Sequence, residues 1–390
     1  MKTSIHLLTI LAVAAGAALI AQGPLVPPGA PAPTMKTLDQ VEPRTPISSL
    51  PFAIASAGSY YLTGNLTGGA GGGITIGATG VTLDLMGYEL VGGTGDGIQI
   101  SPGRTNVVIL NGTVRNWSGD GVDVFGAGHS RLERLRALGN QGSGLRIGPN
   151  GIVADCTAQA NTLNGIEANA GCTLRDCTAS GNLGAYGIRA GAGSTLNNCA
   201  ALNNQTEVGI SAGDGSTLAN CTAHDNNGSG ATSYGIDAGS GSTVIGCTAS
   251  LNTNDNATPS QSAVGINGVF GTLIKACSAR GNEGTGILVN SDCRVLQNNC
   301  DGNLMSGIHV VSSDNRIDGN NVTDGLIGLE VVGAGNIIIG NSAGGNTSNY
   351  EIVAGNKVGI IVEAPDSVAI SGSSGGAGVG TANSWANFSF

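Results

Sequence analysis

One phrase recurs along this chain and limits what the chain can fold into. A glycine followed by isoleucine, valine or leucine returns at intervals of 21 to 30 residues, most often 21 or 22. No segment between these glycines keeps the apolar period of a helix, and each contains short apolar alternations broken by Gly, Asn, Ser and Asp. Such repeats predict a solenoid in which each repeat packs only on its neighbours. The marker glycines are Gly73, Gly97, Gly121, Gly144, Gly165, Gly187, Gly209, Gly235, Gly265, Gly286, Gly307 and Gly328.

Each repeat has room for three short strands and three turns, which make one coil of a parallel β-helix. Stacked coils lie about 4.8 Å apart, so equivalent residues form ladders along the axis. We therefore predict an all-β, single-stranded parallel β-helix of about 12 or 13 coils, with a last degenerate copy at Tyr350. The composition agrees, because 67 glycines and only 3% aromatic residues leave small aliphatic side chains to fill the core.

Cysteine and asparagine each recur at a fixed place in the repeat. One slot holds six cysteines, with Asn111 and Leu135 in the earlier coils, and an asparagine follows five residues later. We expect the asparagine to turn a tight corner, because asparagine tolerates the left-handed conformation. Stacking at about 4.8 Å is too wide for a disulfide, so we expect buried free thiols. The cysteines are Cys156, Cys177, Cys199, Cys221, Cys247 and Cys277, and the asparagines are Asn116, Asn140, Asn161, Asn182, Asn204, Asn226, Asn252 and Asn282.

The two ends of the sequence differ from the repeats. Residues 1–23 have a lysine, an apolar run and then small residues, which is the pattern of a secretory signal peptide, with an uncleaved anchor as the alternative. We assign residues 24–40 to a proline-rich spacer, 41–72 to an N-terminal cap with the first strands, 73–370 to the repeats and 371–390 to a C-terminal cap. This predicts a secreted, periplasmic or cell-surface protein with no membrane span after signal cleavage. A net charge of −10 argues against nucleic acid as a partner.

Three segments resemble a known group of proteins. The stretches "ITIGATGVTLDLMGYEL", "NVVILNGTVRN" and "NRIDGNNVTDGLIGLEV" are similar to right-handed parallel β-helix repeat proteins of the pectate-lyase-like superfamily, and the last is similar to the NosD-type, carbohydrate-associated subset. The resemblance covers roughly residues 70 to 355. It implies a right-handed coil but no particular activity, since this fold occurs in lyases, hydrolases, epimerases, adhesins and tailspikes.

A strip of outward side chains is the candidate binding surface. Two residues after each marker glycine the side chain should point outward, because the residue between them points inward. Charges alternate along this strip, which predicts either an ion-pair ladder or a ligand surface. Three aromatic residues, Trp117, Tyr186 and Tyr234, lie near the strip in sequence. We predict as ligand-binding residues Asp123, Arg146, Glu167, Arg189, Asp237 and Asn267.

The two longest repeats are adjacent in the stack. They have 26 and 30 residues, and both insertions come after the repeated asparagine, at Asn226 and Asn252. We expect the inserted segments to protrude from the same edge and form one ridge beside Asp237 and Asn267. Insertions in a solenoid often mark its working face, although long surface loops are also tolerated without a function.

A group of acidic residues gives a second, chemical interpretation of the strip. Asp96 and Asp120 hold equivalent positions one coil apart, and Asp123 is close to them in sequence. Three carboxylates could hold calcium, which prefers oxygen ligands, whereas an aspartate before glycine is also ordinary turn chemistry. In lyases of the resembling superfamily an arginine such as Arg146 would act on a uronic acid. The candidate catalytic residues are therefore Asp96, Asp120, Asp123 and Arg146, which do not make a complete catalytic set.

These observations favour a binding protein over an enzyme. The chain lacks the paired aspartates of the superfamily's hydrolases, and no CxxC or HxxxH spacing marks a metal site. We expect a secreted or surface-exposed protein that presents a rigid face to a polysaccharide or cell-surface glycan, without a cofactor. The alternatives are a polysaccharide lyase or related carbohydrate-active enzyme, and a purely structural envelope component.

Overall fold

The computed structural model describes residues 43–255, 263–363 and 383–390. The predicted signal peptide, the whole predicted spacer, the first two residues of the predicted N-terminal cap and most of the predicted C-terminal cap, residues 371–390, lie outside this part. The chain divides into two units, of which the second, Thr45–Phe390, contains all the strands. Every regular element of the described part is a strand, and this part has no helix that could cross a membrane.

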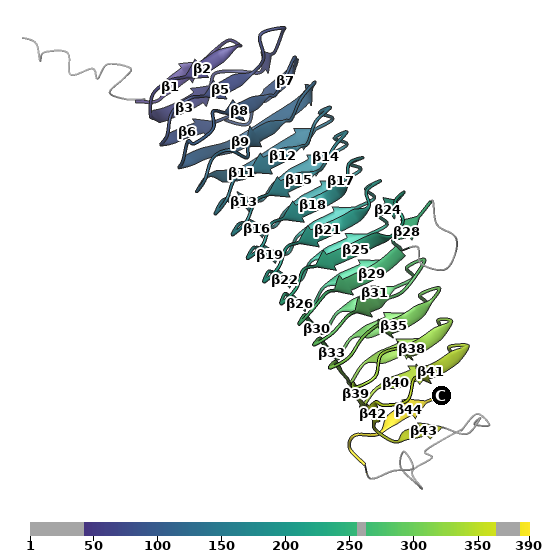
Figure 1. Ribbon diagram of the computed structural model, residues 1–390. Helices are drawn as coiled ribbons and strands as arrows, with labels where there is room; N and C mark the ends of the chain where they lie inside the picture. The colour runs from purple at the N-terminus through teal and green to yellow at the C-terminus, as the bar shows by residue number, and fades with distance from the viewer. Residues whose placement is uncertain (1–42, 256–262, 364–382) are drawn as a thin grey trace, which may run out of the picture. The chain divides into compact units, whose positions relative to one another are not determined.

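The strands stack coil upon coil along one axis, as predicted (Figure 1). One sheet, called here the front sheet, contributes one parallel strand per coil. Its fourteen strands show about one coil more than the glycines mark, because Phe52–Ile54 forms a first rung without a marker glycine. The strands are β2 (Phe52–Ile54), β5 (Ile74–Ile76), β8 (Ile98–Ile100), β10 (Val122–Val124), β12 (Leu145–Ile147), β15 (Ile166–Ala168), β18 (Tyr186–Ala190), β21 (Val208–Ala212), β25 (Ser233–Ala238), β29 (Ala263–Gly268), β32 (Ile287–Val289), β35 (Ser306–Val310), β38 (Ile327–Val331) and β41 (Ser348–Ile352).

The remaining two sides of each coil belong to a second sheet, called here the back sheet. A small third sheet pairs β24 (Asn227–Gly228) with β28 (Thr253–Asn254). The back sheet contains β1 (Thr45–Ile47), β3 (Gly58–Leu62), β4 (Leu66–Thr67), β6 (Val81–Asp84), β7 (Glu89–Gly93), β9 (Val107–Trp117), β11 (Arg131–Leu138), β13 (Ile152–Ala154), β14 (Thr157–Gln159), β16 (Thr173–Arg175), β17 (Thr178–Ser180), β19 (Thr195–Asn197), β20 (Ala200–Leu202), β22 (Thr217–Ala219), β23 (Thr222–His224), β26 (Thr243–Ile245), β27 (Thr248–Ser250), β30 (Leu273–Lys275), β31 (Ser278–Arg280), β33 (Arg294–Leu296), β34 (Asn299–Asp301), β36 (Arg316–Asp318), β37 (Asn321–Thr323), β39 (Ile337–Ile339), β40 (Ser342–Gly344), β42 (Lys357–Val358), β43 (Ile361–Glu363) and β44 (Asn387–Ser389).

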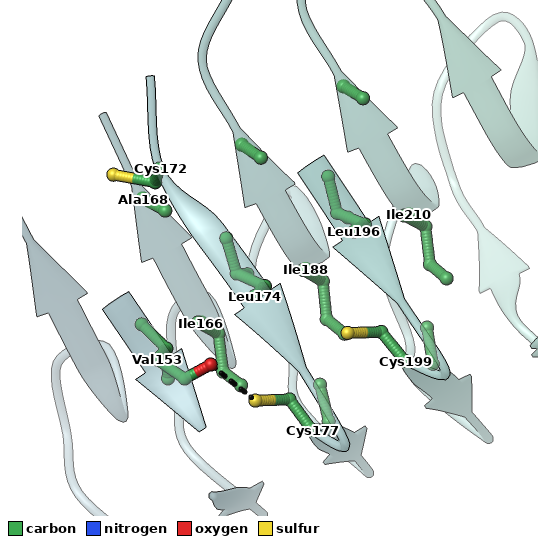
Figure 2. Packing of buried hydrophobic residues seen from close by; sticks show 14 of the residues in the cluster. Val153, Ile166, Ala168, Cys172, Leu174, Cys177, Ile188, Leu196, Cys199 and Ile210 are labelled. Carbon is green, nitrogen blue, oxygen red and sulfur yellow. Dashed lines mark hydrogen bonds between the residues drawn. The ribbon is translucent and has the colours of Figure 1, made fainter. Parts of the chain in front are cut away.

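The core consists of like residues stacked on like residues (Figure 2). In the front sheet Ile166 pairs with Ile188, and Ile188 with Ile210, all fully buried. The back sheet stacks Leu174 on Leu196 in the same way. Because strand residues alternate between the two faces of a sheet, this register points every other residue of the front strands outward.

The cysteines lie in this core, where the sequence placed them. All nine are free and buried. The Cys177 thiol donates to the carbonyl oxygens of Arg175 at 3.2 Å and Val153 at 3.5 Å, the second of which is drawn in Figure 2. The cysteine slot holds Leu135 one coil before Cys156, as expected. The residue opposite Leu135 is Gly112 rather than Asn111, because Asn111 instead takes a left-handed conformation with φ of 60°.

A ladder of buried asparagines connects the coils at one corner. The Oδ1 of Asn182 accepts the N–H and the side-chain amide of Asn161, both at 3.0 Å. Its Nδ2 donates to the Ala158 carbonyl at 3.1 Å and to the next member, Asn204, at 2.9 Å. Each amide therefore satisfies backbone and side-chain groups of neighbouring coils. The ladder consists of Asn140, Asn161, Asn182, Asn204, Asn226, Asn252, Asn282 and Asn303.

These asparagines lie at the corner, as predicted, but the left-handed conformation predicted for them is wrong. The left-handed residue is the one before each of them, with φ of 54° at Ala160 and 50° at Asn203. The asparagine side chain instead points into the coil. There its hydrogen bonds contribute more to stability than they would at a solvent-exposed turn. Asn116 is not in the ladder: it takes the left-handed conformation with φ of 60°, and Trp117 fills the ladder position, donating its N–H to Asn140 Oδ1 at 3.1 Å.

The marker glycines allow close approach to the backbone of the next coil, and those from Gly121 to Gly286 also lie against this ladder. A Cβ at Gly187 would lie 2.7 Å from the carbonyl oxygen of Gly209 and 2.9 Å from Asn204 Nδ2. No side chain fits there without pushing the next coil away. The recurrence of glycine in the sequence therefore reflects close packing between the front strand and the asparagine corner.

Replacing one ladder asparagine should destabilise the whole stack. Asn182→Ala leaves the buried Asn161 N–H and Ala158 carbonyl without partners, so we expect a loss of about 3 kcal/mol in unfolding free energy. Asn321→Ala is the control, because its half-exposed amide only contacts Asn299 at 2.9 Å, and we expect a loss below about 0.5 kcal/mol. Urea unfolding measures both, and equal losses would contradict the role given to the ladder.

The thiols should be unreactive until the protein unfolds. Burial raises the pKa of Cys156 to about 12, so its reactive thiolate is scarce at neutral pH. We expect an aromatic disulfide reagent to label no thiol of the native protein. After denaturation without reductant it should label all nine, and a count of five or fewer would show that disulfides had formed.

Candidate functional site

The front sheet carries the predicted strip as one continuous outward column. Asp123 pairs with Arg146, Arg146 with Glu167, and Glu167 with Arg189, each one coil from the next. Asp237 and Asn267 are neighbours in the same column, two and three coils beyond Arg189. From β8 to β41, the outward column reads Gln99, Asp123, Arg146, Glu167, Arg189, Ser211, Asp237, Asn267, Leu288, His309, Glu330 and Glu351.

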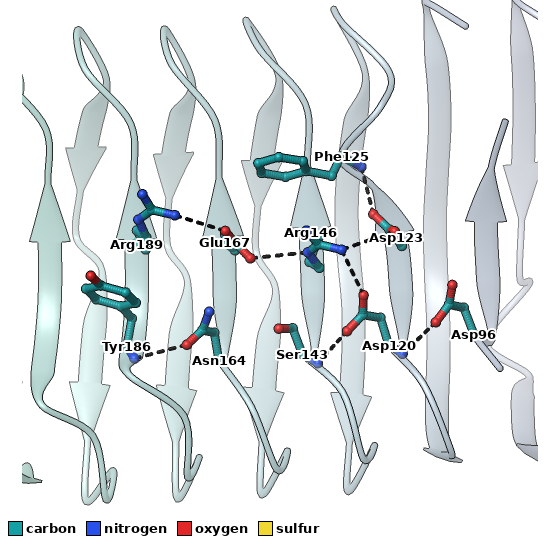
Figure 3. A network of polar contacts seen from close by, with 10 residues as sticks. All are labelled: Asp96, Asp120, Asp123, Phe125, Ser143, Arg146, Asn164, Glu167, Tyr186 and Arg189. Carbon is teal, nitrogen blue, oxygen red and sulfur yellow. Dashed lines mark hydrogen bonds and ion pairs between the residues drawn. The ribbon is translucent and has the colours of Figure 1, made fainter. Parts of the chain in front are cut away.

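Arg146 is the centre of a charged network in the first half of the column (Figure 3). Its Nη1 lies 3.1 Å from Asp120 Oδ2 and 3.2 Å from Asp123 Oδ2. Its Nε lies 3.2 Å from Glu167 Oε2, and the other oxygen of Glu167 contacts Arg189 Nη1 at 3.0 Å. One guanidinium therefore contacts three carboxylates through Nη1 and Nε, so most of its charge is already balanced within the protein.

Asp96 and Asp120 also hold turns together. Asp96 Oδ1 accepts the N–H of Asp120 at 2.7 Å, and Asp120 Oδ1 accepts the N–H of Ser143 at 2.5 Å. Asn164 does the same for Tyr186 at 3.1 Å, so a neutral side chain can fill this role. Burial raises the pKa of both aspartates, and in Asp120 the Ser143 N–H and Arg146 oppose that rise.

The predicted catalytic candidates thus come together, but as a self-satisfied network. Asp96, Asp120, Asp123 and Arg146 use their polar atoms on one another and on backbone N–H groups. Within the described ranges, no group of three His, Cys, Asp or Glu side chains is arranged to hold a metal ion. A calcium ion is not required to balance Asp120 and Asp123, because Arg146 already contacts both.

Two aromatic rings lie on opposite sides of the charged network (Figure 3). The Arg146 guanidinium lies 4.7 Å from the centre of the Phe125 ring, and the Arg189 guanidinium lies 5.4 Å from that of Tyr186. Phe125 was not among the aromatic candidates, although its place directly after β10 could have indicated it. Trp117 was a candidate and is instead fully buried, with its indole N–H donating to the Leu90 carbonyl at 3.2 Å.

The two inserted segments protrude together from one edge. β24 and β28 pair in parallel, with Asn227 opposite Thr253 and Gly228 opposite Asn254 (Figure 1). This agrees with the predicted ridge for the residues that the structure describes, while residues 256–262 of the second insertion lie outside them. The ridge leads directly into β25 and β29, which carry Asp237 and Asn267.

A groove of about 510 Å³ lies on the front sheet beside this ridge. Its polar groups include Tyr234, which was one of the three aromatic candidates, and Ser306, His309 and Glu330, which were not predicted as ligand residues. His309 and Glu330 each follow a marker glycine by two residues, so they belong to the predicted outward strip. Their place in the strip, together with the neighbouring insertions, was the sequence signal that could have identified them. The full lining is Thr232, Tyr234, Val264, Thr285, Leu288, Met305, Ser306, His309, Val311 and Glu330.

Asp237 and Asn267 lie in the column next to this groove but do not line it. The Asn267 side-chain amide donates to Asp237 Oδ1 at 2.8 Å. Burial raises the pKa of Asp237, and the hydrogen bond from Asn267 opposes the rise. The pKa of Tyr234 is also raised, first by burial and then by the charge of Asp237.

A larger hollow of about 770 Å³ opens on the back sheet, away from the column. Its polar side chains are mostly paired with each other: His224 Nδ1 contacts Ser250 Oγ at 2.9 Å, and Arg280 Nε contacts Asp301 at 2.9 Å. Size alone would favour this hollow. The groove beside the ridge is the better candidate, because it has polar atoms without protein partners, as described below.

Asp96→Asn tests whether the acidic group is structural. The amide oxygen keeps the bond to the Asp120 N–H and removes a charge that burial disfavours. We expect unchanged or higher stability at pH 7, by no more than about 1 kcal/mol for a half-exposed group. The pKa of Asp96 in the folded parent protein is raised above the ordinary 3.8. As the pH falls through that folded pKa, the parent protein therefore gains stability, and the difference between it and Asp96→Asn disappears. Asp96→Ala, which lacks the acceptor, should lose about 1 kcal/mol. Thermal melts between pH 7 and pH 4 measure these effects, and a marked loss in Asp96→Asn would show a need for the charge.

Comparisons with known proteins agree with this architecture. A family model described as "Right handed beta helix region" matches residues 62–195. A search of curated protein sequences found no match.

Solved structures match over most of the chain. The A-module of the Azotobacter vinelandii mannuronan C-5 epimerase AlgE6 superimposes with a TM-score of 0.51 and 14% identity, covering 77% of this chain and 89% of that one. The AlgE4 A-module of the same organism gives 0.48 and 14%, covering 77% and 91%. The catalytic domain of a GH87 α-1,3-glucanase gives 0.46 and 13%, covering 76% and 64%. At 14% identity the likeness to the AlgE6 A-module concerns the fold alone, and together with the strand register it shows that the chain has a right-handed parallel β-helix fold.

Proposed function

We propose that this protein binds an extended polysaccharide along the outward column of the front sheet and does not transform it. The observation that carries the proposal is the unbroken column itself. Polar and charged side chains follow one another in register, with aromatic rings and a groove beside them. Such a surface is long in one direction, as a polymer is.

The geometry of the column suits a regular chain. Its side chains repeat about every 4.8 Å, which is close to the length of one sugar unit in an extended polysaccharide. The column is also rigid, because each rung is hydrogen-bonded to the rungs before and after it. A rigid surface binds a ligand with little ordering cost of its own.

The side chains on the column offer the contacts that sugars need. Tyr186 and Tyr234 present ring faces that can stack on the apolar side of a sugar. Arg189 has 48% of its side chain exposed, and it can donate to sugar hydroxyls while it keeps its contact with Glu167. Asp123, Glu167, Asp237 and Asn267 supply further acceptors, as proposed for the ligand-binding residues.

The likeness to the AlgE6 A-module supports a carbohydrate ligand only as an analogy of fold. That protein is named a mannuronan C-5 epimerase. Because one fold carries many activities, the analogy does not transfer the reaction or the uronate substrate to this chain. The second candidate function is a polysaccharide lyase, with Asp96, Asp120, Asp123 and Arg146 as its catalytic residues. The pairing among these residues favours the binding function over this alternative. A glycan-binding role fits the secreted, periplasmic or cell-surface location that the N-terminal segment predicts.

Loss of the ring faces should weaken glycan binding without unfolding the protein. We expect Tyr186→Ala and Tyr234→Ala each to lower the affinity for the best glycan of an array about tenfold, the equivalent of one stacked ring. Tyr88→Ala, which removes an exposed tyrosine from the turn between β6 and β7, should change nothing. Titration calorimetry compares the three variants.

Chromatography of each glycan after long incubation tests for catalysis. Intact glycan supports binding alone, whereas shortened or unsaturated products would replace the proposal with an enzyme. If the array binds nothing, the structural envelope component becomes the better explanation.

A further inference from the structure

The lysines and arginines near the second half of the outward column, from Ser211 to Glu351, all lie on the other sheet. Between Arg189 and Lys357 the sequence has four lysines and arginines, and all four lie on strands of the back sheet, β30, β31, β33 and β36. The same span has 13 aspartates and glutamates. The basic residues are Lys275, Arg280, Arg294 and Arg316.

The groove beside the ridge lies in this acidic half. It extends from Tyr234 to Glu330, a distance of four rungs or about 19 Å along the axis. Glu330 lines it, Glu351 follows Glu330 in the column, and Asp237 lies at the other end. In the charged network of the first half, Arg146 and Arg189 balance their carboxylates. Here His309 is the one side chain in the column that can become cationic.

Two polar atoms in the groove lack a protein partner. Glu330 Oε2 accepts the hydroxyl of Ser306 and lies 3.7 Å from His309 Nδ1, but the structure gives Oε1 no partner among the described residues. His309 Nε2 is buried and has no hydrogen-bond partner within the described part of the chain. Buried polar atoms in folded proteins are nearly always satisfied, and His309 Nε2 is an exception. Glu330 Oε1 belongs to a side chain that is 24% exposed, so it is open to a ligand with a hydrogen-bond donor.

The two atoms, His309 Nε2 and Glu330 Oε1, require different kinds of hydrogen-bond donor. With Nδ1 facing the Glu330 carboxylate, the neutral imidazole carries its proton there, which leaves Nε2 as an acceptor for a hydroxyl. The free oxygen of Glu330 is a carboxylate in a region without basic side chains. A cationic donor stabilises such a carboxylate more than a neutral one does.

We propose that the groove is a subsite for an amino-sugar residue, whose ammonium pairs with Glu330 and whose hydroxyl donates to His309 Nε2. This inference rests on the proposed glycan-binding function and narrows it to polysaccharides that contain free amino groups. The apolar part of the lining, Val264, Leu288 and Met305, would cover the ring face of the sugar.

The same charges disfavour a uronate polymer. A ligand carboxylate in the groove would add a negative charge beside Glu330 with no arginine or lysine to receive it. The charge of Asp237 also contributes, after burial, to the raised pKa of Tyr234, so this end of the groove already carries negative charge. A cationic ligand would reduce that repulsion.

The test compares three hexasaccharides of defined charge: β-1,4-linked glucosamine, its N-acetylated form and mannuronate. At pH 7.0 and low salt, calorimetry on the full chain should show the glucosamine hexamer at least tenfold tighter than the N-acetylated one, with mannuronate the weakest. The preference should shrink as salt rises, because an ion pair at a surface groove is screened.

Glu330→Gln should reduce the preference for glucosamine at least fivefold while leaving the weaker affinity for the N-acetylated hexamer unchanged. Asp292→Asn is the matched control: it removes the same charge from an exposed turn outside the groove, at a position with φ of 61° that asparagine tolerates, and should keep the preference. Melting curves verify that both variants fold.

Three results would overturn the inference. Equal affinity for the charged and acetylated hexamers would do so, and so would a preference that Glu330→Gln leaves intact. Stabilisation by calcium chloride alone that depends on Glu330 would show a metal site instead of an amine site. In each case binding to a neutral glycan would leave the proposed function standing, whereas a failure of all three hexamers and of the array would remove both.

Discussion

Hydrogen bonds between equivalent groups of successive coils hold this structure together. The backbone supplies most of them, and the buried asparagine ladder completes them at the corner where two sheets meet. The ladder requires close approach: a Cβ at Gly209 would lie 2.7 Å from Asn226 Nδ2 and from the carbonyl oxygen of Gly235. The glycine, the asparagine and the spacing between them are therefore one constraint, and the small aliphatic core and free thiols fit inside the coil that it defines.

The same constraint places the functional surface. Because the coils cannot slip relative to one another, every outward residue of the front sheet is in register with the next. A single substitution therefore changes the side chain at one defined position along the axis. Insertions are confined to the corners, where they do not disturb the ladder. β24 and β28 show this arrangement, since they extend two adjacent corners and leave the front strands beside them intact.

The outward column has two halves with different electrostatics. In the first half, Arg146 and Arg189 balance the carboxylates around them, and two of those carboxylates also hold the turns before the marker glycines. In the second half, no basic residue faces the column, and Glu330 and His309 keep polar atoms without protein partners. The first half stabilises the stack, and the second half has binding capacity that the fold itself does not use.

The sequence alone determined the coil, the strip and the free cysteines, because a solenoid makes residues at equal positions of the repeat neighbours in space. The order Asp123, Arg146, Glu167, Arg189 could thus be predicted from spacing. Spacing says nothing about contacts across a corner or about how a side chain turns. Only the tertiary structure showed that the left-handed residue precedes Asn161 and Asn204, and that Asp120 reaches across to Arg146 as well as capping a turn. It also decided that Trp117 enters the core and that Tyr234, Ser306 and Glu330 share one groove. Those contacts join residues at different positions of the repeat, so their geometry depends on the angle between sheets and not on the period of the sequence.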